Sequence, residues 1–479
     1  MPGEALMRTD GTPARSRCPM QVSRRRFLGV AGAAAAAAQA DLLGFAASLF
    51  GEEPKPAGQP VVNVVFMRPE KPLVVSWPGG NCDVGAQQAL FTKTLTEAAE
   101  RLGVRLEVRS APIDKPEDVS ACIEQLKTSP PDGLIVCAME LFRWETVNRV
   151  VQNRGDIPTI IYSNLSGFTG NLQCARHMPR TFLGATQDVG WLAFALRMLA
   201  TIWRMRNTRL LLVAGEGGDK TVENLGTTFH GIPKSRFEEE FRKVEETDEV
   251  RAMADFYARN AKEIVEPSKA DILLAARNYV VIRRLLEAEK CQGISIDCLG
   301  WANPVCLAYS RLLDEGVVAG CEADQGAALG MLLVNLLFNR PSFIQDPSPN
   351  TVNNTLIGAH CTSGTRLEGP DSPYRAPYLL RSYHTRTGCS PQVLWPEGMD
   401  VTILTFTGTT SMAVGTGRVR SNIAQPPSGC CRTSVEIELD GVADTRDVKG
   451  FHQLFVLGNL GRMLKAYGQL AGIRVDPIA

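Results

Sequence analysis

The stretch Val317–Phe338, VVAGCEADQGAALGMLLVNLLF, decides how the middle of this chain folds. It begins with an apolar run typical of a buried strand, turns at the acidic doublet Glu322 and Asp324, and continues from Ala327 as an apolar helix. A strand that leads directly into a helix is half of a parallel βαβ unit, and ligands collect at the carboxyl ends of such strands. The doublet therefore either only starts the helix or also belongs to a binding site.

Upstream of this stretch, strand and helix patterns alternate over two blocks. Residues 61–184 are predicted to form an N-terminal α/β domain, because amphipathic helical segments separate the apolar runs VVNVVFM, RLEVRSA, GLIVCAM and PTIIYS. Residues 185–354 are predicted to form a central α/β domain with strands at RLLLVAG, ADILLAA, GISIDCLG and VVAGCEAD. A long charged helical region is expected from Phe237 to Val265.

Beyond residue 354 the pattern changes to short strands separated by turn residues. These strands are predicted at NTLIGAH, DVTILTFTG, SMAVGTGRV and SVEIELDG, and a helix from about Leu457 to Leu470 follows them. The predicted fold class is thus α/β, with two successive parallel-sheet domains followed by a mainly β C-terminal domain over residues 355–479.

The first 40 residues are predicted to be a targeting signal and not part of the fold. The segment Ser23–Leu28, SRRRFL, precedes an alanine-rich run that ends in the small residues Ala38 and Ala40. This resembles a twin-arginine export signal, with residues 41–60 as a linker, and predicts a periplasmic or extracellular protein. The alternative is a disordered basic tail. Since no other stretch approaches twenty apolar residues, we expect no membrane-spanning helix in the mature chain.

Composition narrows the function classes. The chain of 479 residues has 51 basic and 51 acidic residues, and this zero net charge gives no indication of nucleic-acid binding. Thirteen cysteines are present without a CxxC pair, which weighs against a zinc knuckle or a thioredoxin-type site.

Four side chains form the candidate site. The helix after Glu322 is followed by a second carboxylate, Asp346, in SFIQDPS. A strand-end Glu, a helix and a strand-end Asp have βαβ spacing, which would bring both carboxylates to the same edge of the sheet. His360 in LIGAHC and His452 in GFHQLFVLGN belong to the third domain. Carboxylates and imidazoles together suit Mn²⁺ or a similar ion, although each histidine alone could be a packed or surface residue.

Three separated segments carry a family resemblance. CEADQGAALGMLLVNLLFNRPSFIQD, GAHC and FHQLFVLGNLGRMLKAYGQLAGIRV resemble the metal-site and closing segments of the L-fucose isomerase and L-arabinose isomerase superfamily. The resemblance covers about residues 290–479. It implies a Mn²⁺-dependent aldose–ketose isomerase that works through an ene-diol, with Glu322 and Asp346 as acid and base. It further implies that these carboxylates, His360 and His452 hold the metal, and that the chain forms homo-oligomers, trimers or hexamers.

Two tryptophans are candidates for contact with a sugar substrate. Trp77 lies in WPGGNCD and Trp301 in GWAN, both at turns after predicted strands. A tight glycine turn is the competing interpretation of the first. Two other functions stay open: a periplasmic-type carbohydrate-binding protein, or an isomerase-like protein that has lost its activity. A binding protein would have no use for a third domain that carries His360 and His452.

Overall fold

The computed structural model describes residues 58–71, 74–76, 81–140, 144–164, 177–215, 217–299, 301, 304–383, 387–424 and 431–479. The predicted signal segment 1–40, the linker up to residue 57, and Trp77 lie outside these residues. Within the described part of the chain, no helix is both long and apolar enough to cross a membrane.

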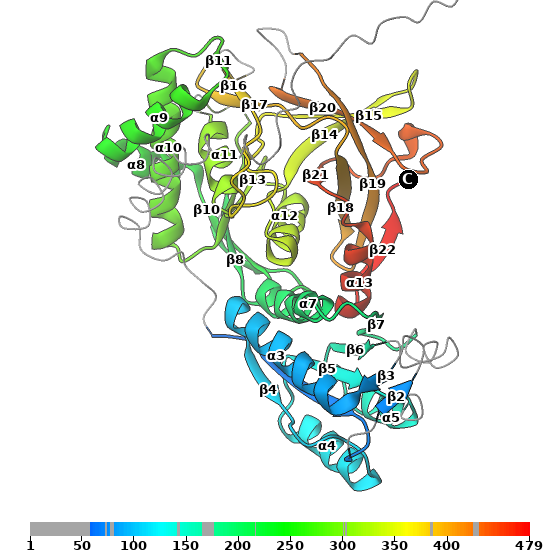
Figure 1. The fold of residues 1–479 in the computed structure, drawn as a ribbon. Helices are drawn as coiled ribbons and strands as arrows, with labels where there is room; N and C mark the ends of the chain where they lie inside the picture. Colours follow the sequence, from blue (N-terminus) through cyan, green and yellow to red (C-terminus); the bar gives the residue numbers. More distant parts are fainter. Residues whose placement is uncertain are drawn as a thin grey trace, which may run out of the picture. The chain divides into compact units, whose positions relative to one another are not determined.

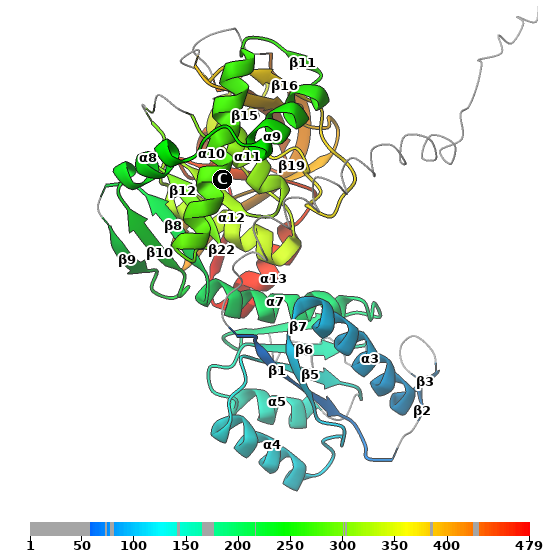
Figure 2. The ribbon, with the colours of Figure 1, turned by 90° about the vertical axis from the view of Figure 1, so that its left-hand side faces the viewer.

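The first sheet is parallel and has five strands in the order β4-β1-β5-β6-β7. The strands are β1 (Val61–Met67), β4 (Arg105–Val108), β5 (Gly133–Ala138), β6 (Thr159–Ser163) and β7 (Thr181–Ala185). Helices α4 (Pro116–Thr128) and α5 (Trp144–Gln152) lie together on one side, and α3 (Val84–Leu102) packs against α7 (Trp191–Arg206) (Figures 1 and 2). Strands buried on both faces need continuous apolar runs, which β1 and β5 have. The predicted α/β order is confirmed here.

A small hairpin departs from the expected order. The run LVVSW has the apolar pattern of a buried strand, but its residues Val74–Ser76 form β2, which pairs with β3 (Asn81–Asp83) in antiparallel fashion. Helix α3 then begins at the cap Asp83, whose side chain accepts hydrogen bonds from the backbone N–H groups of Gly85 and Ala86.

The second sheet has the order β13-β12-β8-β10-β9 and is parallel except for its edge strand β9 (Gly218–Thr221). Its parallel strands are β8 (Arg209–Val213), β10 (Thr228–Ile232), β12 (Gly293–Ile296) and β13 (Val318–Cys321). The helices of this region are α8 (Lys234–Lys243), α9 (Asp248–Asn260), α10 (Lys269–Ala288), α11 (Cys306–Asp314) and α12 (Gln325–Phe338). The strand–turn–helix predicted around Glu322 is confirmed as β13 and α12.

Two predictions in this region are wrong. The run ADILLAA was predicted as a strand but lies inside α10, because Ser268 and Asp271 form a reciprocal capping box that starts a helix just before it. A short apolar run alone does not separate a buried strand from a buried helix. The long helix expected over 237–265 is instead the pair α8 and α9, followed by the two-residue strand β11 (Glu263–Ile264).

The third region contains a closed antiparallel barrel (Figure 1). Its strand order is β18-β21-β14-β15-β20-β19, and β19 pairs back with β18 to close the ring. The barrel strands are β14 (Phe343–Asn350), β15 (Thr355–His360), β18 (Asp400–Gly408), β19 (Ser411–Asn422), β20 (Thr433–Leu439) and β21 (Gln453–Leu457). Strand β22 (Arg474–Pro477) adds to β19, and β16 (Tyr378–Arg381) and β17 (Ser390–Val393) form a small sheet with β11. The mainly β prediction is confirmed.

The predicted last helix begins later than expected. The structure has α13 at Gly461–Ala471, because the residues up to Leu457 belong to β21.

Asp346 does not stand where βαβ spacing predicted it. It lies in the middle of β14, which pairs in antiparallel fashion with β15 and β21 and not with β13. The register places Asp346 opposite Ala359, the neighbour of His360. The carboxylates of Glu322 and Asp346 therefore come from two different sheets. The sequence FIQDPSPN also lacks the continuous apolar run of a strand buried on both faces.

Candidate metal centre

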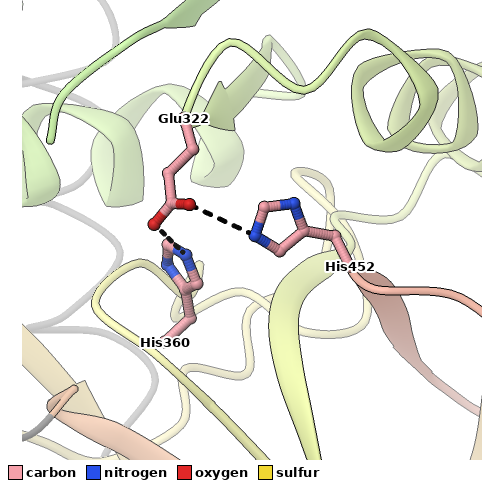
Figure 3. Close-up of side chains that lie close together, drawn as sticks. All are labelled: Glu322, His360 and His452. Atoms are coloured by element: carbon pink, nitrogen blue, oxygen red, sulfur yellow. Dashed lines mark ion pairs between the residues drawn. The ribbon is translucent and has the colours of Figure 1, made fainter.

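Three segments that are distant in sequence bring one carboxylate and two imidazoles together. Glu322 directly follows β13, His360 is the last residue of β15, and His452 directly precedes β21. One ligand atom from each lies within 4.8 Å of the others. Glu322 Oε1 is 3.4 Å from His360 Nε2, and its Oε2 is 3.4 Å from His452 Nε2. Figure 3 shows the carboxylate with one oxygen toward each ring.

The backbone at Glu322 is strained. Glu322 has φ 60° and Ala323 has φ 53°, both in the left-handed region that favours glycine. Each such residue costs on the order of 1–3 kcal/mol and persists only where its surroundings enforce it. Here the N–H of Ala323 donates a 3.0 Å hydrogen bond to the carbonyl of Ile296 at the end of β12. The turn is thus fixed to the sheet edge, and it directs Glu322 toward the two histidines.

Asp346 approaches His452 from the barrel. Its Oδ1 lies 3.3 Å from His452 Nε2, and 43% of its side chain is exposed. Asp346 is outside the group whose atoms share the 4.8 Å limit, so it stands beside the three-residue group. His452 Nε2 therefore faces two carboxylates, one on each of the two sheets.

The unpaired polar atoms fit a divalent cation. His360 and His452 are only 4% and 6% exposed. Nε2 of both rings and Oδ1 of Asp346 have no hydrogen-bond partner in the described part of the chain. Buried polar atoms are normally hydrogen-bonded, so several that converge on one point indicate a ligand. Two imidazole nitrogens with carboxylate oxygens form a donor set that suits Mn²⁺ or a similar ion.

Asp324 has a function that the sequence analysis missed. Its Oδ1 accepts from the N–H of Ala327 at 2.8 Å and so caps α12, as predicted. Its Oδ2 lies 2.7 Å from Nδ1 of His452. An Nδ1–H that donates to a carboxylate leaves the Nε2 lone pair free for a metal. The spacing of two residues between Glu322 and Asp324 was the available signal, but only the distant His452 gives it meaning.

The charges stabilise this arrangement without a metal. The adjacent imidazoles of His360 and His452, each 3.4 Å from a carboxylate oxygen, hold the pKa of Glu322 well below its usual range and outweigh its burial. Burial opposes protonation of His452, but Asp324, Asp346 and Glu322 outweigh it and raise the pKa of His452 to about 11. The pKa of His360 is also raised, because Glu322 outweighs the burial of the ring. A metal ion would have to displace these protons from the imidazoles.

Cysteines lie next to the ligand residues. The Sγ of Cys321, the residue before Glu322, is 3.3 Å from the hydroxyl of Thr362. A hydrogen bond from the Cys321 thiol lowers the pKa of Cys298 to about 7; burial opposes this, and the N–H of Glu322 adds to it. Cys361, the residue after His360, packs with Cys306, Tyr383 and Cys431.

Of the two tryptophans predicted to contact substrate, Trp301 packs against helix α8. The ring of Trp301 packs against Phe237, with 5.0 Å between ring centroids, and the Nζ of Lys234 is 5.8 Å from its centroid. Both neighbours belong to α8. Trp77 lies outside the described residues.

One comparison with known proteins finds a sugar isomerase among the proteins to which this chain is similar. The chain is similar to the sulfoquinovose isomerase of Alkalicoccus urumqiensis, with 24% identity over 318 residues that cover 57% of this chain and 69% of that protein. No family model matches the chain.

Solved structures give only a distant likeness. A periplasmic component of a sugar ABC transport system from Hahella chejuensis has 14% identity and a TM-score of 0.17, covering 50% of this chain and 79% of that chain. A sugar-binding protein of a sugar ABC transporter from Bacillus halodurans has 14% identity and a TM-score of 0.17, covering 61% of this chain and 90% of that chain. TM-scores this low support no conclusion about the fold or the function of this chain.

Proposed function

We propose that this protein is a Mn²⁺-dependent aldose–ketose isomerase that works through an ene-diol. The observation that carries the proposal is the convergence of Glu322, His360 and His452 on one point, with Asp346 beside them. The similarity to a sulfoquinovose isomerase supports it, since that protein is also a sugar isomerase.

The chain's own residues suit the proton transfers of this reaction. A proton must leave one of the first two sugar carbons and arrive at the other, so the reaction needs an acid and a base beside them. Glu322 and Asp346 reach His452 at 3.4 and 3.3 Å from separate sheets, and we assign these two carboxylates to that task. His360 and His452 hold the metal together with them. The metal, when bound, polarises the sugar oxygens as a Lewis acid.

The substrate we propose first is sulfoquinovose, followed by L-fucose and L-arabinose. The first comes from the name of the similar protein, and the other two come from the resemblance of the segments around Glu322, His360 and His452. The test incubates the Mn²⁺-loaded protein with each sugar and measures product by NMR. The amounts of product rank the three sugars as substrates. Failure of all aldoses to isomerise would contradict the proposal.

Export and assembly are also proposed. The segment SRRRFL and the alanine-rich run after it support export by the twin-arginine route, to the periplasm or outside the cell. Cell fractionation with Arg24 and Arg25 replaced by Lys tests this; unchanged export would contradict it.

The resemblance to the superfamily supports a trimer or hexamer, and a monomer in light scattering of the active protein would contradict that.

The experiment that tests the proposed function replaces Glu322 with Gln. This keeps the shape of the side chain and removes its capacity to accept a proton, so turnover should fall by roughly 10²–10⁴-fold. Glu97→Gln is the matched control, because Glu97 is an exposed residue of α3. Turnover of Glu322→Gln equal to that of the control would end the assignment.

The second candidate function is carbohydrate binding without turnover, in a binding protein or in an inactive relative of the isomerases. The two five-stranded sheets with parallel cores favour it. Tight binding of a sugar to the wild-type protein, without isomerisation at any metal concentration, would replace the first proposal with this one.

A further inference from the structure

Phe451 is the most exposed aromatic side chain in the described part of the chain. Its exposed fraction is 75%, and Tyr374 at 37% is the other aromatic among the exposed large apolar residues there. Phe451 directly precedes the buried His452. The centroids of their rings are 4.7 Å apart, with the planes inclined at 55°. An exposed aromatic ring thus lies in contact with a residue of the metal centre.

The backbone around Phe451 is firmly held. Gly450 has φ 91°, and a Cβ at this position would lie 2.7 Å from Cγ2 of Thr405. The hydroxyl of Thr405 donates a 2.9 Å hydrogen bond to the carbonyl of His452. On the other side, the N–H of Lys449 donates a 2.8 Å hydrogen bond to the carbonyl of Ile478. Phe451 is therefore fixed between two anchored residues, which makes it a suitable surface for a ligand.

The exposed ring of Phe451 stands beside a group of converging polar atoms. Small-molecule sites are lined by aromatic side chains near a few convergent polar groups, and here those groups are the orphan atoms of His360, His452 and Asp346. The ring of Phe451 contacts one of these residues, His452.

We propose that the ring of Phe451 binds the C–H face of the sugar substrate beside its reacting end. The inference rests on the proposed function and adds a residue that positions and selects the substrate. A sugar has apolar C–H surfaces between its hydroxyl groups, and an aromatic ring offers a flat apolar surface to cover them. Trp301, which was expected to stack on the sugar, packs against Phe237 instead.

The test compares Phe451→Ala with the wild-type protein on sulfoquinovose, or on whichever aldose the wild type isomerises. We expect KM to rise about tenfold, as lost aromatic contact with bound substrate predicts, while kcat changes by less than about threefold. The Mn²⁺ content, measured by mass spectrometry of the metal, should stay at the wild-type value. Phe451→Tyr keeps the ring and should recover most of the loss.

The control is Val352→Ala, because Val352 is also a strongly exposed apolar residue, at 92%. A KM for Phe451→Ala equal to that of the control would overturn the inference and leave the isomerase assignment intact. An unchanged KM with a smaller molecular mass in light scattering would assign the ring to a contact with a second copy of this chain. If the wild type isomerises no aldose, the proposed function fails and the inference falls with it.

Discussion

Substitution of Asp324 by Asn separates the two functions of this carboxylate. An Asn side chain can still accept the hydrogen bond from the N–H of Ala327, so the cap of α12 is kept. The amide NH₂ then faces Nδ1 of His452, where Oδ2 of Asp324 stood at 2.7 Å. Because an amide N–H donates, Nδ1 must accept, and the imidazole proton moves to Nε2. That nitrogen faces Glu322 and Asp346, so the protein loses a metal ligand.

The expected loss of Mn²⁺ affinity follows from the contribution of carboxylates that orient a metal-binding histidine. Removal of the partner that orients a ligating histidine typically weakens metal binding by about 10–100-fold. This corresponds to roughly 1.4–2.7 kcal/mol of binding free energy. Replacement of Asp324 by Ala should weaken metal binding to a similar extent. It should also lower the free energy of unfolding by about 1 kcal/mol more than Asn does, because it removes the cap as well.

The assay is a titration of the metal-free protein with Mn²⁺, followed by calorimetry or by the electron paramagnetic resonance signal of free Mn²⁺. Asp83→Asn is the matched control, since Asp83 caps α3 with the same geometry and belongs to the first α/β region. The control should bind Mn²⁺ as the wild type does. If Asp324→Asn binds Mn²⁺ within twofold of the control, the reasoning about the orientation of His452 is refuted.

Three further predictions concern pH. The pKa of His452 near 11 and the raised pKa of His360 mean that Mn²⁺ binding displaces protons from both rings, so affinity should rise by about tenfold or more per pH unit from pH 6 to 8 in titration calorimetry; a flat profile would contradict this. In the metal-free protein the folded-state pKa of His452 exceeds the unfolded value of 6.5. Protonation of His452 therefore stabilises the fold fully below pH 6.5, and this stabilisation declines as pH rises toward 11. Urea unfolding in EDTA, with His452→Gln as the reference, measures the decline. The pKa of Cys298, about 7, predicts that its alkylation by iodoacetamide reaches half its maximal rate near pH 7, whereas Cys321, with a raised pKa, reacts slowly. A midpoint for Cys298 above pH 8.5 in peptide mass spectrometry would sink this prediction.

Much of the fold was accessible from the sequence because its signals are local. Strands β1 and β5 have apolar runs that predict buried strands. Helix α4 has an apolar pattern with the period of a helix. The prediction for the run ADILLAA failed because the capping box of Ser268 and Asp271, which begins before the run, decided between strand and helix. Strand β14 was placed in the wrong sheet because pairing partners are a property of the whole chain, and no local pattern reveals them.

The candidate site could likewise be predicted from the sequence only where its signals are local. Glu322, His360 and His452 were chosen from motifs, and the structure brings them together. The left-handed turn at Glu322 is fixed by a hydrogen bond to Ile296 on another strand, and Asp324 contacts a histidine 128 positions away, so the sequence alone could not supply either feature. Trp301 was selected for its chemistry and its place after a strand; its ring packs against that of Phe237, and its contact with a sugar stays a prediction.

The most direct test of the central claim is the Mn²⁺ content of the purified protein, with His452→Ala measured beside the wild type. The account predicts about one Mn²⁺ per wild-type chain after loading and dialysis, and a loss of nearly all of it in the variant. Equal metal content in both proteins, or none in either, would contradict the claim that Glu322, His360 and His452 form one metal centre.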